Sequence, residues 1–234
     1  MARKLSPSSS LSGAFLLPLL VALGPTLGCS SETEEPSTKS GVDRLVYAVR
    51  QHTVVTDEGV SIDVAGGMGQ VMDYNRFNPG GRLEIYDTRT ATTENVLAGQ
   101  PFETTSDVSS LHVSYDAIKV VFTMKTANDD SYHVYWTALE KGPGGTFDIH
   151  QLTFGPNDDE HAIFIAGDRI AFITNQAYTE MGTRADEYNH SRVVTQMATI
   201  TLAGGDADRK LCSQNLSHTI NLFPLADGRV GFSR

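Results

Sequence analysis

The sequence predicts an all-β fold, and three observations carry this prediction. A motif of two apolar segments joined by a short turn occurs three times, over residues 111–125, 161–175 and 218–234. Between the copies, apolar and polar residues alternate over short stretches, which is the period-2 pattern of β-strands. No stretch after residue 28 shows the apolar spacing of an amphipathic helix.

The N-terminus predicts export. Two basic residues at positions 3 and 4 precede a ten-residue apolar run, Ala14 to Leu23, which suits a signal peptide and is too short to span a bilayer. The run is followed by Leu27, Gly28 and Cys29, an ending that resembles a bacterial lipobox although Leu27 stands where a small residue is usual. We therefore expect residues 1–28 to be a lipoprotein signal peptide and Cys29 to carry the lipid. The alternative is a plain secreted protein with a chance cysteine.

A polar tether is expected after the lipidated cysteine. Residues 29–41 are small, polar and acidic after Cys29, without apolar periodicity, and predict a disordered linker between membrane and domain. Ser30, which follows Cys29, is typical of outer-membrane sorting. The expected location is the bacterial cell envelope, anchored by lipid, in the outer membrane.

The folded part, residues 42–234, is expected to repeat one strand order. If the four strands of one unit are labelled a, b, c and d, the sequence predicts the series b–c–d, a–b–c–d, a–b–c–d, a–b. An aromatic residue marks each b-strand: Tyr47, Phe122, Phe172 and Phe232. Residues 51–79 interrupt the series as a long excursion. Four-stranded units at this period predict a β-propeller of about three blades. The alternative is a compact β domain of three repeats that is not a propeller.

Three complete a-strands are too few to close a propeller ring, which needs about four to eight blades. We therefore expect the chain to be the N-terminal part of a longer propeller protein.

Two sets of motifs resemble known families. VSYDAIKVVF (113–122), HVYW (133–136), QLTF (151–154) and AGDRIAF (166–172) resemble the blades of TolB-type propellers. RFNPGGRLEIYD (76–87), DVSSLHVSYD (107–116) and LADGRVGFSR (225–234) resemble propeller lipoproteins classed by similarity to the hydrazine synthase alpha subunit. The resemblance implies a propeller fold over residues 44–234. It also implies haem-attachment motifs elsewhere in longer relatives, whereas this sequence has no C-x-x-C-H.

Charge limits the partners. The 234-residue chain has a formal net charge of −10. Because an acidic chain repels phosphate backbones, nucleic acid is not an expected partner. The expected partners are the membrane, through the lipid anchor, and an envelope protein or a small ligand.

Three histidines are candidate metal ligands. His112, His161 and His218 each stand at the predicted start of an a-strand, and a-strands line the channel of a propeller. Three convergent imidazoles could bind a divalent metal such as zinc or copper. The alternative is three independent loop residues bonded to backbone, in which case no cofactor is expected.

Other residues that could belong to a functional site are mainly expected to have a structural role. Asp116, Asp168 and Asp227 are expected to stabilise the a–b turns. NDDEH (157–161) lacks the spacing of a calcium loop, and AGGMGQ (65–70) lacks the lysine of a phosphate-binding loop. Cys212 is expected to be a buried, inert thiol, with a nucleophile paired to His218 as the alternative.

The predicted function is a membrane-tethered bacterial lipoprotein whose TolB-like propeller binds a protein or a ligand. No catalytic residues can be assigned, so the sequence favours a binding module over an enzyme. The alternative is the propeller region of a redox enzyme subunit similar to hydrazine synthase alpha.

Overall fold

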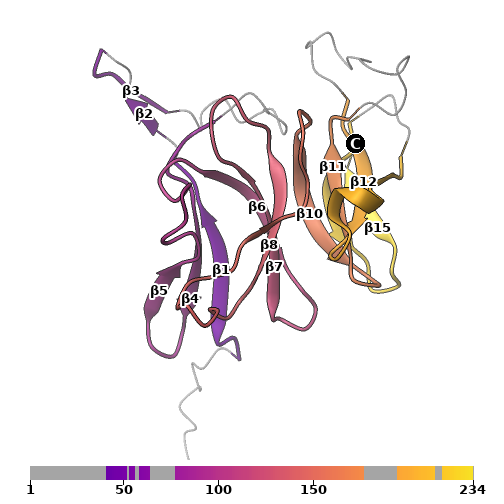
Figure 1. Cartoon of the computed structure of the whole chain (residues 1–234), viewed down its shortest axis with the longest axis horizontal. Helices are drawn as coiled ribbons and strands as arrows, with labels where there is room; N and C mark the ends of the chain where they lie inside the picture. The colour runs from indigo at the N-terminus through magenta and orange to yellow at the C-terminus, as the bar shows by residue number, and fades with distance from the viewer. Residues whose placement is uncertain are drawn as a thin grey trace, which may run out of the picture. The chain divides into compact units, whose positions relative to one another are not determined.

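A computed structural model describes residues 41–51, 53–55, 58–63, 77–176, 194–213 and 218–233 (Figure 1). The signal peptide, Cys29, the tether up to residue 40 and the segment 65–70 lie outside these residues. The described chain is built of strands, and its helical part is one 3-10 turn, Gly205–Asp208. Among the described residues, no helix has the length and apolar character needed to cross a bilayer. The predicted all-β class is confirmed.

The strands form antiparallel sheets in chain order. The first sheet has the order β1-β4-β5, two sheets of four strands follow, and a pair and a separate hairpin complete the set. The bounds of the first sheet are Arg44–Val49 (β1), Arg82–Asp87 (β4) and Thr92–Asn95 (β5). Those of the second are Asp107–Val113 (β6), Lys119–Lys125 (β7), His133–Ala138 (β8) and His150–Gln151 (β9).

The third sheet repeats the second. Its strands are Asp159–Ile165 (β10), Arg169–Thr174 (β11), Gln196–Thr201 (β12) and Lys210–Leu211 (β13). The pair is Ile220–Pro224 (β14) with Val230–Ser233 (β15), and the hairpin is Thr53–Val55 (β2) with Ser61–Asp63 (β3). The predicted order b–c–d, a–b–c–d, a–b–c–d, a–b is therefore observed, with the hairpin inside the predicted excursion 51–79.

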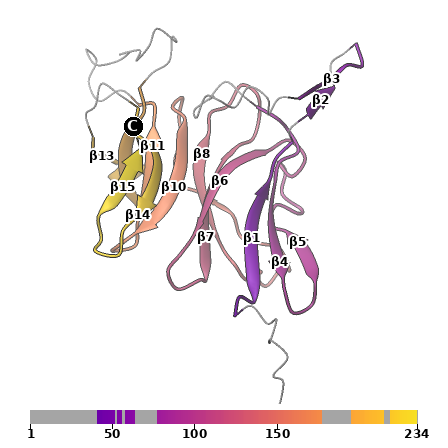
Figure 2. The same cartoon turned by 180° about the vertical axis from the view of Figure 1, so that it is seen from behind.

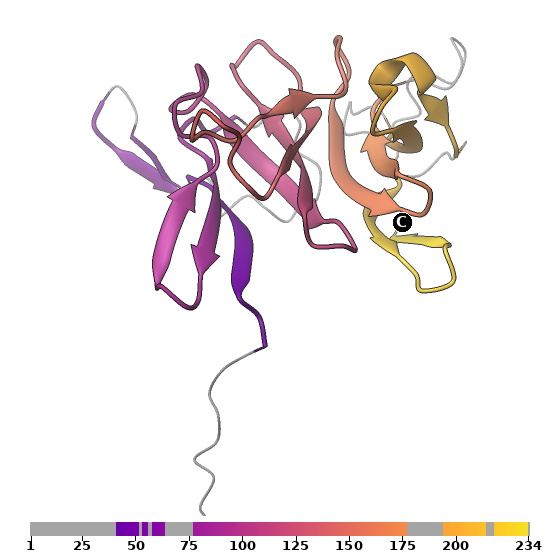
Figure 3. The ribbon, with the colours of Figure 1, turned by 60° about the horizontal axis from the view of Figure 1, so that its bottom comes forward.

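Successive sheets stack face to face. The inner strands β6, β10 and β14 contact one another in sequence, and β1 of the first sheet contacts β6; Figure 2 labels all four, and Figure 1 shows the same sheets from the opposite side. Figure 3 shows the same succession of sheets from another angle. Repeated four-stranded sheets whose inner strands adjoin have the architecture of propeller blades.

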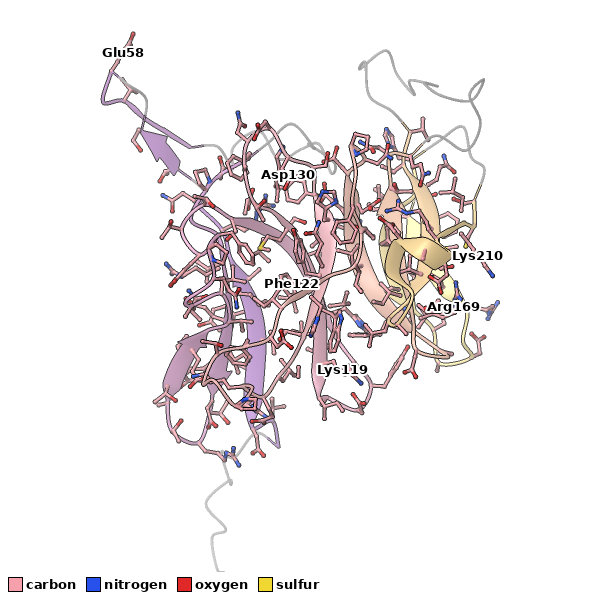
Figure 4. All side chains as sticks on the ribbon, viewed as in Figure 1. Glu58, Lys119, Phe122, Asp130, Arg169 and Lys210 are labelled. Atoms are coloured by element: carbon pink, nitrogen blue, oxygen red, sulfur yellow. The ribbon has the colours of Figure 1, made fainter. Side chains whose placement is uncertain are left out.

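Strand β7 explains why the sheets stack. Its side chains alternate between two apolar clusters: Val120, Phe122 and Met124 pack toward the first sheet, whereas Val121 packs toward the third. Phe122 is fully buried and lies centrally in the stack (Figure 4). Because both faces of the strand are covered, its sequence is a nearly continuous apolar run instead of an apolar–polar alternation.

The a–b turns are stabilised by aspartates, as predicted. The carboxylate of Asp116 accepts hydrogen bonds from the Ser114 hydroxyl at 2.5 Å and the Ile118 N–H at 3.2 Å. Asp227 accepts the N–H of Arg229 at 3.1 Å. Asp168 adopts a φ of 52°, a left-handed conformation that aspartate tolerates better than most residues.

The outer strands are short. Strand β5 ends at Asn95, and the next two residues, Val96 and Leu97, are fully buried. Strands β9 and β13 contain two residues each. The apolar character of these segments reflects burial in the core and not extension of the sheet.

Candidate functional site

The three histidines do not occupy equivalent positions, which corrects the predicted register. His112 is near the end of β6 and pairs with Val121, His161 lies within β10 between residues whose register shifts, and only His218 precedes its strand. His112 is five residues after Asp107, which opens β6, whereas His161 is two residues after Asp159, which opens β10. Each of the two strands has one bulge, between Val108 and Ser110 and between Glu160 and Ile163, so the bulges do not account for the difference.

Two of these histidines already have partners. Nδ1 of His112 accepts the N–H of Phe164 at 3.3 Å, which links β6 to β10. Nδ1 of His218 accepts the N–H of Thr195 at 3.2 Å. Within the described part of the chain, no three His, Cys, Asp or Glu side chains are grouped so that they could hold a metal ion. The metal site therefore remains a prediction without support from this geometry.

Cys212 was expected to be buried, but it is exposed. It follows directly after β13, the two-residue strand at the edge of the described sheet β10-β11-β12-β13. Its thiol lies 3.6 Å from the Thr199 hydroxyl. Cys212 is exposed because it lies at the outer edge of the sheet, and the apolar–polar pattern does not reveal where that edge is.

A bidentate ion pair lies where the first inner strand begins. Asp107 starts β6, and its side chain is fully buried. Arg50, the residue after β1, donates from Nε and Nη2 to the two carboxylate oxygens, both at 2.8 Å. The same carboxylate also accepts a hydrogen bond from the Tyr132 hydroxyl at 2.8 Å and another from the Asn78 N–H at 3.2 Å. Burial, and then the charge of Asp107, raises the pKa of Tyr132, so the phenol stays protonated.

The next sheet repeats this device. Asp159 starts β10, is fully buried, and accepts from Arg209 at 3.0 and 2.5 Å. The guanidinium of Arg209 also lies 5.2 Å from the ring centroid of Phe172. Repetition at equivalent strand starts indicates that the aspartate–arginine pair is a structural clamp of the fold.

Lys125 lies beside the ion pair of Arg50 and Asp107 but forms no ion pair with a described residue. It ends β7, pairs with Asp107 across the sheet, and is 5% exposed. Its ammonium lies 5.8 Å from the ring centroid of Phe77 and 5.9 Å from that of Tyr132. No carboxylate or hydrogen-bond acceptor among the described residues reaches it. Nearly complete burial of a lysine side chain is unfavourable unless its charge is compensated or its ammonium reaches water.

Glu160 and His161 add two titratable groups whose pKa values burial shifts. Glu160 is 7% exposed, and burial, reinforced by the charge of Asp158, raises its pKa to about 7, against opposing contributions from Arg50 and a Ser109 hydrogen bond. Burial lowers the pKa of His161, which therefore stays neutral. His161 has a φ of 50°, and its ring makes no hydrogen bond within the described residues. Left-handed backbone at a non-glycine residue is often found at functional sites.

We call this group of residues the polar cluster: Arg50, Asp107, Lys125, Tyr132, Asp158, Glu160 and His161. It differs from the hollows at the opposite strand ends. The larger of these, about 690 Å³ in volume, contains Arg44 and Arg89, which already pair with Glu140 at 2.5 Å and Asp87 at 3.3 Å. The polar cluster therefore has the stronger unused capacity for binding.

The sequence reading identified His161 but missed the other members. Arg50, Asp107 and Lys125 are far apart in the chain, and Lys125 ends an apolar strand where a solvated lysine is the usual expectation. The signal available was the aspartate that opens both DVSSLHV and DEHAIFI. An acidic residue at the start of a buried inner strand requires a partner.

Comparisons with known proteins bear on the fold. No family model and no curated protein matches this chain. Among solved structures, hydrazine synthase of Kuenenia stuttgartiensis superimposes with a TM-score of 0.59 at 14% identity, covering 82% of this chain and 28% of that chain. A structure from a study of two prolyl endopeptidases has a TM-score of 0.42 at 16% identity, covering 70% of this chain and 22% of its own.

At these identities the hydrazine synthase likeness concerns the fold alone, and the chain spans about a quarter of that protein's length. Together with the stacked four-stranded sheets, it identifies the described chain as a β-propeller-like domain.

Proposed function

We propose that this protein is a bacterial envelope lipoprotein whose propeller-like domain is a binding module, with the polar cluster as its binding site. The apolar leader and the lipobox-like ending at Cys29 support the membrane anchor. Ser30 favours the outer membrane. The likeness to hydrazine synthase is a likeness of fold at 14% identity, so no redox activity is proposed for this chain.

The two ends of β1 make different contacts. At the start of β1, Arg44 donates to the Leu139 carbonyl at 3.0 Å, whereas after its end, Arg50 reaches the polar cluster. A six-residue strand spans about 20 Å. The described domain therefore begins near one end of β1, and the polar cluster lies near the other.

The observation that carries the proposal is the unpaired state of two side chains in the polar cluster. The clamps saturate Asp107 and Asp159, as a purely structural network requires. Lys125 and His161 are left without hydrogen-bond partners among the described residues. Binding sites characteristically hold such polar groups ready for a ligand.

The test is thermal unfolding of the full chain, purified in detergent, against a panel of anionic, neutral and cationic small molecules. The site variant is Lys125→Met with His161→Gln. The matched control is Lys141→Met with His150→Gln, a lysine and a histidine outside the cluster whose side chains are 41% and 43% exposed. At least one compound should raise the unfolding temperature of the wild type and the control but not of the site variant. If every compound acts equally on all three proteins, the proposed function is wrong.

A further inference from the structure

The internal repeat shows that the fold does not need a lysine at position 125. Asp107 pairs with Lys125 across β6 and β7, and the equivalent Asp159 pairs with Thr174 across β10 and β11. Thr174 is fully buried and hydrogen-bonds Asp159, so a neutral side chain satisfies this position in the third sheet. The charge at Lys125 is therefore an addition to the repeat and not part of its architecture.

The carboxylates near Lys125 are already engaged. Asp107 accepts from Arg50, Tyr132 and the backbone. Asp158 accepts the N–H of Tyr132 at 3.0 Å on one oxygen and the amide of Asn175 at 2.8 Å on the other. The Lys125 charge acts on Asp158 only through space, where it opposes the effect of burial on the pKa of that carboxyl.

The aromatic rings compensate Lys125 only in part. A cation over the faces of Phe77 and Tyr132 is attracted by the ring quadrupoles. A ring face, however, is a poor substitute for the acceptors that the three N–H groups of an ammonium ordinarily bind. Nη1 of Arg50 likewise has no hydrogen-bond acceptor among the described residues, because the clamp uses Nε and Nη2. The cluster thus holds two cationic groups with free donors.

We infer that the polar cluster binds an oxyanion, a carboxylate or phosphate group, with the Lys125 ammonium as its counter-charge. This inference rests on the proposed binding function and specifies its ligand class. Oxygen atoms of such a group satisfy the free N–H donors, and charge-assisted hydrogen bonds of this kind are among the strongest in proteins. The repeat argument separates this role from a structural one.

The test compares oxyanions at constant ionic strength. Thermal unfolding of the full chain is measured in sodium chloride, sodium phosphate and sodium succinate, so that phosphate and carboxylate are distinguished. The wild type should gain stability with at least one oxyanion, and Lys125→Met should gain none. Lys141→Met is the matched control, because Lys141 also lies over a ring, 5.7 Å from Phe147, but is paired with Glu94 at 3.0 Å.

A second measurement does not depend on a folded variant. Acetylation of lysines in the wild type is followed by mass spectrometry, and the bound oxyanion should slow modification of Lys125 at least several-fold while Lys141 reacts at an unchanged rate. Equal stabilisation of the wild type and Lys125→Met, or equal acetylation with and without oxyanion, overturns the inference.

The outcome also separates this inference from the proposed function. If only neutral or cationic compounds of the panel act through the site, the binding function stands and the oxyanion is rejected. If no compound acts through the site, both are rejected.

Discussion

Glu160 makes the polar cluster sensitive to pH. Its pKa rises from 4.5 to about 7, first because of burial and second because of Asp158. A carboxyl whose pKa is raised on folding binds more protons in the folded than in the unfolded state between these two values. Its contribution to stability is therefore present below pH 4.5 and is lost as the pH rises through about 7.

We predict that Glu160→Gln raises the free energy of unfolding relative to the wild type, and that it does so by more at pH 8 than at pH 5. The pKa shift of Glu160, which is almost wholly buried, corresponds to roughly 3 kcal/mol of unfolding free energy. Urea unfolding at both pH values measures the difference between variant and wild type. Taking the difference between variant and wild type removes the pH dependence of the other groups, among them His161, whose pKa burial lowers.

Glu58→Gln is the control for this prediction, because Glu58 is exposed at the tip of the β2–β3 hairpin (Figure 4). Its unfolding free energy should follow that of the wild type at both pH values. An identical pH dependence of Glu160→Gln and the wild type would show that Glu160 is not desolvated.

Strand ends position the functional groups. Lys119 and Arg169 begin β7 and β11 at the end away from the polar cluster, whereas Asp130 lies beyond the other end of β7 (Figure 4). At the clamp, Gly81, which precedes β4, lies close to the start of β6. It donates its N–H to the Ser106 carbonyl at 2.8 Å.

We predict that Gly81→Ala destabilises the domain and disturbs the clamp. An added Cβ would lie 2.8 Å from the Val108 nitrogen and 3.0 Å from the Asp107 Cα, so backbone must move. Overpacking of this kind costs about 1–3 kcal/mol. Chemical denaturation measures the loss.

Gly142→Ala is the matched control, since its added Cβ would meet only the Thr146 carbonyl oxygen at an ordinary 3.6 Å. It should unfold within about 1 kcal/mol of the wild type, because alanine at a compatible glycine position lowers the entropy of the unfolded chain and stabilises by only about 0.4–1 kcal/mol. Equal stability of the two variants would mean that β4 and β6 can separate without penalty.

For the whole molecule, the proposed anchor determines where the domain acts. We predict that Cys29→Ala moves the full-length protein from the membrane fraction to the soluble fraction, because lipid on this sulfur is the proposed attachment and supplies ~0.8 kcal/mol per buried CH₂. Cell fractionation and incorporation of labelled palmitate measure the change. Cys212→Ala, which alters the other cysteine, should remain in the membrane fraction and keep its label.

Retention of Cys29→Ala in the membrane fraction would contradict the lipid anchor. It would leave the oxyanion site untouched, because the polar cluster lies at the other end of β1.

The repeated motifs were sufficient to predict the order of strands, since each copy carries the same apolar run, the same aspartate turn and the same aromatic marker, such as Phe122 and Phe172. These features depend on local preferences: turn residues and alternation act over a few neighbours. The histidine register could not be predicted in the same way. Where a strand begins depends on its pairing with a neighbouring strand, and β6 begins at Asp107, five residues before His112.

By itself, the sequence determined the all-β class, the order of the strands and the turns, because local backbone preferences and apolar period decide them. Only the tertiary structure decided that Lys125 is buried with no ion pair to a carboxylate of the described residues, that Arg50 clamps Asp107 across 57 residues of chain, and that Cys212 is exposed. Burial and charge pairing are properties of residues distant in the chain that meet when sheets stack. Their energies are set by desolvation, which no local pattern records.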